Sequence, residues 1–250
     1  MKYFTKEWYE LCQKTSFHFS LEEDQQAEKF SEEFFQQVYD KELQSWLDLQ
    51  EEIHHHLVTN HGHTETFDRE KEEANFHDSF LYNYEHIKKG LPENILNEIA
   101  DLRVFALNKA SHTVIDVVTK FCEENKRIIE DVGENFSKYY KNASKSFTPE
   151  IVENFAFHDC TVVKTVQNGS SLTIQFDTLG GFTDINEITF ENMKILKQDS
   201  ALDEAWWLYE EIYKIDDKYE FHVLLQNQFM ELIDFIIEAE HVSFAQNKEK

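Results

Sequence analysis

Histidines and carboxylates crowd together in one stretch of the chain. Seven histidines fall between residues 54 and 86, among many Asp and Glu residues. Imidazole combined with carboxylate is a common ligand set for first-row transition metals. On the helices expected for this stretch, one group of four side chains could converge, and its members are Glu52, His56, Glu73 and His77. The pattern suggests a site for a divalent transition metal within residues 52–77.

Helix geometry explains how these four residues could meet. If the buried face of a first helix runs through Ile53, then Glu52 and His56 lie on one flank of that face, at about 100° per residue. Glu73 and His77 are four residues apart, so they share a face of the next helix. The spacing is not His-Glu-x-x-His, and the Glu-x-x-His pairs in this stretch lack the second half that a di-iron site needs. The alternative interpretation is a set of scattered, solvated surface side chains.

Two adjacent tryptophans form a second candidate site. Trp206 fits an apolar stripe expected on a short helix over residues 202–213, and Trp207 lies about 100° round from that stripe. An exposed Trp207 would be a natural anchor for a partner, because tryptophan is enriched at interface hot spots. Its acidic rim would consist of Asp203, Glu204, Glu210 and Glu211. The alternative is that Trp207 packs under a loop or on a neighbouring sheet.

Arg103 is a third unusual residue, because it falls on the expected apolar face of a third helical run. A buried arginine needs an acidic partner, and Glu73 is a candidate. Such a pair would fix the register of the helices. The alternative role for Arg103 is to bind a substrate or another anion.

The overall charge excludes several classes of function. The chain has 250 residues, with 49 Asp and Glu against 24 Lys and Arg, so its net charge is −25. Nucleic-acid-binding domains are basic where they meet phosphate, and an anionic membrane surface repels negative charge. A basic protein is therefore the expected partner, because opposite charge steers association. The 22 phenylalanines indicate a folded chain rather than an acidic disordered one.

No familiar catalytic motif occurs in the sequence. It has no Gly-x-Gly-x-x-Gly, no Walker A and no Gly-x-Ser-x-Gly. Cys12, Cys122 and Cys160 are odd in number and form no Cys-x-x-Cys, which is typical of reduced thiols in a cytoplasmic protein. Residues 1–9 lack the pattern of a secretory signal, and no apolar stretch approaches the roughly 20 residues of a membrane-spanning helix. We therefore expect a cytoplasmic protein that is not an enzyme.

Residues 1–150 predict helices. Ser20-Leu21-Glu22-Glu23 matches a capping box, and an apolar stripe with steps of three or four continues from there to about residues 60–62. A second helix is expected over 68–89, before Gly90. A third run over 93–131, before Gly133, would be about 58 Å long as one helix. That length predicts a break at about residues 109–113.

Residues 151–250 predict mainly strands. Asn168-Gly169 lies between two alternating runs, which predicts a hairpin with these two residues in a type I′ turn. Later runs with a period of two extend the pattern, at residues 188–195, 219–225 and 233–237. Short helices are expected after Thr148-Pro149 and over 202–213. The predicted fold class is α+β, with a helical region at 1–150 and a β-rich antiparallel region at 151–250 that one helix crosses.

Two parts of the chain carry a family resemblance. They are the opening Met1-Lys2-Tyr3-Phe4-Thr5-Lys6-Glu7-Trp8-Tyr9 and the later runs Trp206-Trp207-Leu208-Tyr209-Glu210-Glu211-Ile212-Tyr213 and Phe221-His222-Val223-Leu224-Leu225. These runs resemble an uncharacterised family from low-GC Gram-positive bacteria, the domain of unknown function 4085. The resemblance implies a bacterial, intracellular protein. It implies no activity, so it transfers no functional residues.

Two functional hypotheses follow from the sequence. The first is a non-enzymatic acidic module that binds a basic protein, in the manner of an inhibitor or of the small bacterial immunity proteins that its composition resembles. The second is a metal-dependent enzyme or sensor in the helical region, which would use the Glu and His residues of 52–77. Metal content separates the two, because only the second requires a bound ion.

Overall fold

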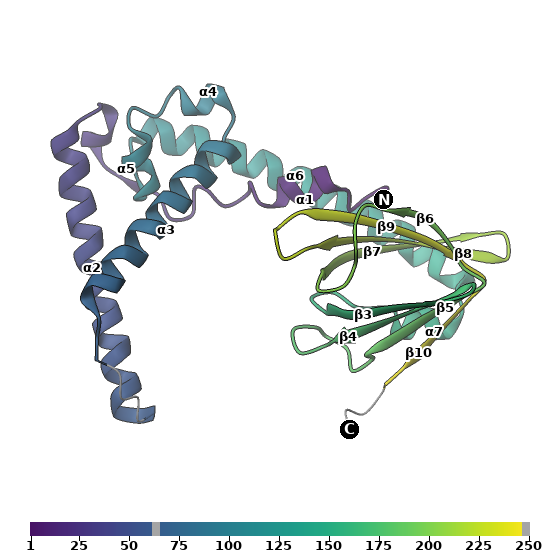
Figure 1. Ribbon diagram of the computed structural model, residues 1–250. Helices are drawn as coiled ribbons and strands as arrows, with labels where there is room; N and C mark the ends of the chain where they lie inside the picture. The colour runs from purple at the N-terminus through teal and green to yellow at the C-terminus, as the bar shows by residue number, and fades with distance from the viewer. Residues whose placement is uncertain (62–65, 247–250) are drawn as a thin grey trace. The chain divides into compact units, whose positions relative to one another are not determined.

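The computed structural model describes residues 1–61 and 66–246. The chain forms two compact units. Leu11–Arg127 make up the helical unit, and Met1–Glu10 together with Ile128–Lys250 make up the sheet unit (Figure 1). The fold class is α+β, as predicted. The compact units do not follow the change of secondary structure near residue 150, because the first ten residues and the end of a long helix belong with the sheet.

The helical unit is built around two long helices, α2 (Glu32–His61) and α3 (Arg69–Gly90). The Ser31 hydroxyl accepts a hydrogen bond from the Phe34 amide at the start of α2, and the Asp68 carboxylate accepts one from the Lys71 amide at the start of α3. The remaining elements are α1 (Lys6–Cys12), β1 (Glu22–Glu23), η1 (Gln25–Glu28), α4 (Glu93–Leu96), α5 (Leu102–Ala106), β2 (Lys109–Ala110) and α6 (His112–Ala143). Part of α1 and part of α6 lie in each unit.

Two expectations for the helical region are wrong and one is confirmed. Ser20-Leu21-Glu22-Glu23 does not start a helix, because Glu22–Glu23 form β1 and pair in parallel with β2. Gly133 does not end the third run, because α6 continues through it to Ala143. The predicted break is present, since the chain leaves helical geometry between α5 and α6.

In the described part of the sheet unit, eight strands lie in the order β10-β5-β4-β3-β7-β8-β9-β6, and every pairing between them is antiparallel. The strands are β3 (Thr161–Asn168), β4 (Ser171–Asp177), β5 (Glu187–Glu191), β6 (Lys194–Gln198), β7 (Trp206–Ile215), β8 (Lys218–Gln226), β9 (Leu232–Ala239) and β10 (His241–Ala245). Two short helices, η2 (Ser144–Ser146) and α7 (Pro149–Asn154), precede them.

The sheet bends between β3 and β7, which share the single residue pair Thr161–Trp206. Figure 1 shows the result, with β6, β9, β8 and β7 in one layer and β3, β4, β5 and β10 in the other. Apolar side chains fill the space between the layers. Phe157, Phe190, Phe221 and Phe235 are fully buried there.

The predicted hairpin is present between β3 and β4, with a turn one residue further along than expected. Asn168 pairs with Ser171, so Gly169 and Ser170 are the two turn residues. Gly169 has φ of +60°. A positive φ at the first turn residue alone is the pattern of a type II′ turn, rather than the type I′ turn predicted from Asn-Gly.

The predicted helix over 202–213 is wrong, because this segment forms most of β7. Its pairing with β8 shifts register between Trp207 and Tyr209, so Leu208 is an extra residue in a β-bulge. In a regular strand, buried and exposed side chains alternate. The bulge interrupts this alternation, so the apolar residues have the spacing of a helix.

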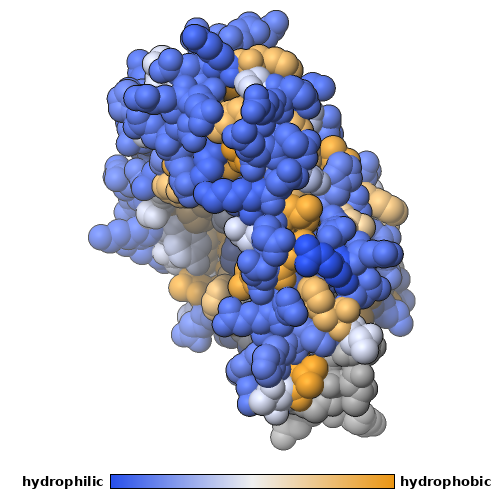
Figure 2. Space-filling view, turned by 90° about the vertical axis from the view of Figure 1, so that its left-hand side faces the viewer, coloured by the Kyte–Doolittle hydropathy of each residue, from blue (hydrophilic) through white to orange (hydrophobic). Residues whose placement is uncertain are grey.

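Hydrophilic side chains cover most of the face that Figure 2 shows. On the face that Figure 2 shows, hydrophobic side chains form small separate areas among hydrophilic ones. Among the described residues, no helix is both long enough and apolar enough to cross a membrane.

Candidate functional site

The four predicted metal ligands do not form one site in the structure. His77 of α3 lies beside Tyr39 of α2, and the Tyr39 hydroxyl is 3.1 Å from the His77 Nδ1. His56 is 17 residues further along the same helix, which is about 25 Å at 1.5 Å per residue. Glu73 forms an ion pair with Arg69 at 3.0 Å, and Glu52 is exposed. Within residues 1–61 and 66–246, no group of three or more His, Cys, Asp or Glu side chains could hold a metal ion.

Arg103 has acidic partners, although Glu73 is not one of them. Its guanidinium group bonds the Asp101 carboxylate at 2.8 Å and the Glu32 carboxylate at 2.9 Å. It also stacks on the ring of Phe35, with 4.2 Å between the guanidinium carbon and the ring centroid. The hydrogen bonds to Asp101 and then Glu32 raise the pKa of Arg103 further above its usual range. Arg103 therefore joins α5 to the start of α2. This arrangement agrees with the first of the two predicted roles, an ion pair that fixes the register of the helices.

Trp207 is not exposed, and the prediction that it is an exposed anchor is wrong. Its side chain is fully buried between the two layers of the sheet, against the rings of Phe155 and Phe157. Its indole Nε1–H donates a hydrogen bond of 2.8 Å to the Glu210 carboxylate. The exposed tryptophan of the pair is Trp206, whose side chain is 51% exposed. Because adjacent residues of a strand face opposite sides, burying Trp207 turns Trp206 outward.

Glu211 is also buried, and it binds the start of the chain rather than a partner. One carboxylate oxygen accepts hydrogen bonds from the amides of Tyr3 and Phe4, at 2.8 and 2.7 Å. The other oxygen accepts from the Lys2 amide at 2.8 Å and from the Tyr213 hydroxyl. Glu210 lines a pocket beside these residues. Of the predicted acidic rim, Asp203 and Glu204 remain on the surface.

Strand pairing places the exposed Trp206 in a row with the ends of other strands. Trp206 pairs with Thr161, which pairs with Asp177 at the end of β4. On its other side Trp206 pairs with Gln226 at the end of β8, and Gln226 pairs with Leu232 at the start of β9. The connections 178–186 and 227–231 therefore leave the sheet at the same end as Trp206.

Large apolar side chains are exposed on these connections. We call them, together with Trp206, the loop-end surface, and they are Leu179, Phe182, Trp206, Phe229 and Met230. Their exposed fractions run from 51% for Trp206 to 93% for Leu179. Exposed acidic residues lie on or next to the same connections and just before β7, namely Asp177, Asp184, Asp203, Glu204 and Glu231. Single exposed apolar residues are ordinary on proteins, but a group of this kind with a polar rim is typical of an interaction site.

Both connections are held in defined conformations. The Asn227 side chain accepts hydrogen bonds from the amides of Phe229 and Glu231, each at 2.9 Å. Met230 adopts a positive φ of +64°, which is uncommon for a residue other than glycine. In the other connection, a Cβ on Gly181 would lie 2.4 Å from the Cys160 sulfur, so the chain passes too close there for any larger residue. Specific contacts therefore hold the backbone of both connections.

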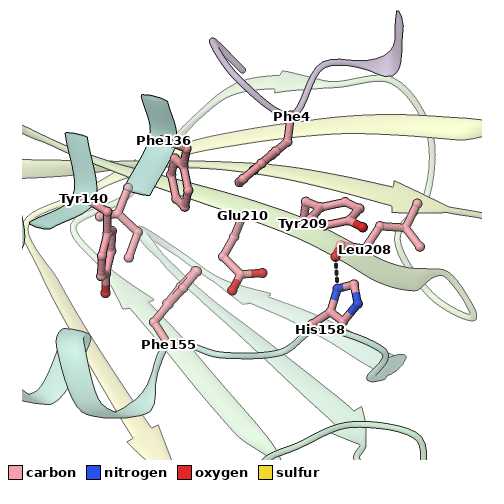
Figure 3. Close-up of a pocket in the computed structure, with 9 residues that line it drawn as sticks. Phe4, Phe136, Tyr140, Phe155, His158, Leu208, Tyr209 and Glu210 are labelled. Carbon is pink, nitrogen blue, oxygen red and sulfur yellow. Dashed lines mark hydrogen bonds between the residues drawn. The ribbon is translucent and has the colours of Figure 1, made fainter. Parts of the chain in front are cut away.

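A pocket of about 350 Å³ lies within the same unit (Figure 3). The residues that line it come from four segments, and they are Phe4, Phe136, Tyr140, Phe155, His158, Leu208, Tyr209, Glu210 and Ile212. The β-bulge positions Glu210, which is the carboxylate among the described residues that line the pocket. Because Leu208 is an extra residue, Glu210 faces the same side of β7 as Trp207, three positions earlier. An unbroken strand would turn Glu210 to the opposite face.

The comparisons with known proteins give a family and no activity. The model of the family described as "Protein of unknown function (DUF4085)" matches residues 29–236. No curated protein and no solved structure was found to match the chain.

Proposed function

We propose that this chain, which belongs to the family of proteins of unknown function DUF4085, is a non-enzymatic module that binds a basic protein through its loop-end surface. The observation that carries the proposal is the exposed Trp206 among other exposed apolar side chains, with carboxylates around them. The expected anchor shifts by one residue, from Trp207 to Trp206. Asp203 and Glu204 keep the rim role that the sequence suggested for them.

The apolar centre and the acidic rim would have different tasks in such an interface. Exposed ion pairs contribute only about 0–1 kcal/mol each, so the rim would mainly accelerate association and select for positive charge. Aromatic residues that lose their water on binding supply most of the affinity, often 2 kcal/mol or more for one side chain. The aromatic residues of this surface are Phe182, Trp206 and Phe229, and each side chain is at least half exposed before binding.

The net charge of −25 favours a basic protein as the partner, rather than a second copy of this chain or an anionic membrane. Two copies of so acidic a chain repel each other, and an anionic bilayer would repel the rim. We further propose a cytoplasmic location, since the three cysteines are free thiols rather than disulfides. The alternative function, a metal centre in the helical unit, has no support from the residues that the structure describes.

A peptide with the proposed chemistry tests this function directly. Fluorescence anisotropy would measure the binding of a labelled synthetic peptide of alternating lysine and leucine residues. The apolar test variants are Trp206→Ser and Phe229→Ser. The matched control is Ile215→Ser, because Ile215 is 44% exposed at the other end of β7. We expect each test variant to weaken binding at least tenfold, and the control to weaken it less than twofold.

The charge on the rim is tested in the same assay. The double variant Asp203→Asn/Glu204→Gln is compared with Asp216→Asn/Asp217→Asn, which removes the same charge from the exposed turn between β7 and β8. Equal effects of the two double variants would mean that the peptide responds to net charge alone, which contradicts the proposal. Binding to phosphatidylcholine vesicles that requires Trp206, or self-association that requires it, would contradict the proposal in favour of a lipid or of a second copy.

A further inference from the structure

The pocket of the sheet unit has aromatic walls that are already in contact with one another. The ring of Phe4 lies 4.5 Å from that of Phe136 and 5.2 Å from that of Tyr209, centroid to centroid. Phe136 is 5.9 Å from Tyr140 on the same face of α6. A volume of about 350 Å³ is within the range of pockets that hold small molecules. Figure 3 shows the Glu210 carboxylate among the rings of Phe136, Phe155 and Tyr209.

Glu210 is a carboxylate without a cationic partner. Among the described residues, its hydrogen bond comes from the Trp207 indole at 2.8 Å, and no lysine or arginine forms an ion pair with it. Burial raises the pKa of Glu210 to about 7, and the bond from Trp207 and the nearby His158 only partly oppose this. A carboxylate held in apolar surroundings is costly to ionise unless a positive charge compensates it.

The ring of His158 is engaged by groups other than Glu210. Its Nδ1 bonds the carbonyl oxygen of Leu208 (Figure 3). Because a carbonyl oxygen only accepts, Nδ1 carries the hydrogen. The Nε2 atom is 3.6 Å from the Asp159 carboxylate, on the other side of the ring from the bond to Leu208. The position beside Glu210 is therefore open to a cation from outside the chain.

We propose that this pocket binds a small organic ammonium ion with a compact apolar body, whose charge lies against Glu210 and whose alkyl groups lie on the aromatic faces. Aromatic faces attract cations that approach within about 6 Å of the ring centroid. An alkylated ammonium sheds its water more easily than a metal ion, which suits apolar walls. An anion would be repelled by Glu210, and a neutral molecule would leave the carboxylate uncompensated.

The walls of the pocket are held in place before any ligand arrives. Glu211 bonds the amides of Lys2, Tyr3 and Phe4, which fixes the ring of Phe4 over the pocket. Tyr139 of α6 donates from its hydroxyl to the Ile212 carbonyl at 2.8 Å, which ties α6 to β7. A preformed pocket does not spend binding energy on ordering its walls. Glu211 is thus a positioning residue for the aromatic wall, and Glu210 is the residue that contacts the ligand.

Isothermal titration calorimetry with benzyltrimethylammonium tests the proposal on the full chain at pH 8. Phenylacetate and benzyl alcohol present a similar ring with a negative or a neutral group. We expect the cation to bind, and each comparison compound to bind at least about tenfold more weakly. Equal binding of the three compounds would overturn the proposal, and so would the absence of cation binding at millimolar concentration.

Matched variants then assign the binding to this pocket. Glu210→Gln removes the charge but keeps an oxygen that can accept from Trp207, and Phe136→Leu replaces a ring with an aliphatic group. The controls make the same substitutions at exposed positions outside this pocket and outside the loop-end surface, as Glu191→Gln and Phe19→Leu. We expect at least about tenfold weaker binding for Glu210→Gln, about threefold or more for Phe136→Leu, and less than twofold for the controls. Undiminished binding by folded Glu210→Gln would overturn the proposal.

A pH series on the unmodified protein needs no variant. The ammonium charge of the probe is permanent, so protonation of Glu210 should weaken its binding by up to about tenfold for each pH unit below 7. The other titratable groups that face Glu210 are His158, Tyr140 and Cys160. Burial raises the pKa of Tyr140, and it raises the pKa of Cys160 to about 11, so these two stay neutral.

The contribution of His158 to that pH series is removed with His158→Asn, whose amide can replace Nδ1–H. We expect this variant to keep the pH dependence and Glu210→Gln to lose it. The opposite result, a pH dependence that follows His158, would contradict the role assigned to Glu210.

Discussion

Replacing Glu210 with glutamine should stabilise the protein above pH 7 and have less effect in mild acid. Burial raises the pKa of Glu210 from an ordinary 4.5 to about 7 in the folded state. The folded protein therefore holds this proton more tightly than the unfolded chain does. As the pH rises from 4.5 to 7, the folded state loses stability relative to the unfolded state, and above pH 7 this loss is complete. The glutamine variant has no such proton to lose.

The size of the effect follows from the same pKa values. One pKa unit corresponds to about 1.36 kcal/mol, so the full difference is about 3 kcal/mol. About 2 kcal/mol of it should develop between pH 5.5 and pH 8.5. Urea unfolding, monitored by circular dichroism, gives the free energy of unfolding of both proteins at both pH values. The quantity to compare is the stability of the variant minus that of the unmodified protein at pH 8.5, against the same difference at pH 5.5. The glutamine oxygen can still accept from Trp207, so the folded structure should be unchanged.

Glu204→Gln is the control for this experiment. It removes the same single charge from an exposed position, so it reports the general benefit of lowering a net charge of −25. We expect its stability to change by less than about 0.5 kcal/mol at either pH. A Glu210→Gln effect that is equal at pH 5.5 and pH 8.5, or that matches the control, would refute a buried carboxylate that ionises near neutral pH.

Three further predictions concern stability and are checked by urea or thermal unfolding. Glu211→Ala should cost about 3 kcal/mol or more, because it leaves three backbone amides and a buried hydroxyl without their acceptor; a loss below 1 kcal/mol would contradict the anchoring of the chain start. Gly169→Val should cost about 1 kcal/mol or more, because φ is +60° there, whereas Gly133→Ala within α6 should gain about 0.5–1 kcal/mol, since a Cβ there meets nothing within 4 Å. Trp206→Ser should change the free energy of unfolding by less than about 0.5 kcal/mol, whereas Trp207→Leu should lower it by several kcal/mol. Similar values for the two variants would contradict the placement of the two side chains on opposite faces of β7.

Local signals predicted the helical unit well where the cause of the structure is itself local. The helix expected over 68–89 is α3 (Arg69–Gly90), because the Asp68 cap and the apolar spacing act within one or two turns. The break before α6 followed from length alone. The failure at Ser20–Glu23 has a tertiary cause, because Glu22–Glu23 pair with β2, which is far away in the sequence. A capping pattern cannot reveal a distant strand that competes for the same backbone.

The candidate sites were harder to predict than the elements, because each depends on which elements are neighbours. The metal hypothesis assumed that His56 and His77 lie at the same level of two packed helices. Contacts of Tyr39 with His77 and of His54 with Phe67 show that α2 and α3 run in opposite directions. His77 therefore lies beside the early part of α2, whereas His56 belongs to its last turns. The loop-end surface likewise depends on strand register across the sheet, which no single run of residues encodes.

The sequence 202–213 shows how one bulge can mislead a periodicity argument. Leu202, Trp206, Tyr209 and Tyr213 have helical spacing, which predicts a helix. In β7 the extra residue Leu208 shifts every later side chain to the other face. A strand without this bulge would place Trp207 and Glu210 on opposite faces, and the Trp207 indole could not bond the carboxylate. The β-bulge that made the segment look helical in the sequence therefore also places Glu210 in the pocket. Deleting Leu208 should separate Trp207 from Glu210 and abolish any binding of an ammonium probe.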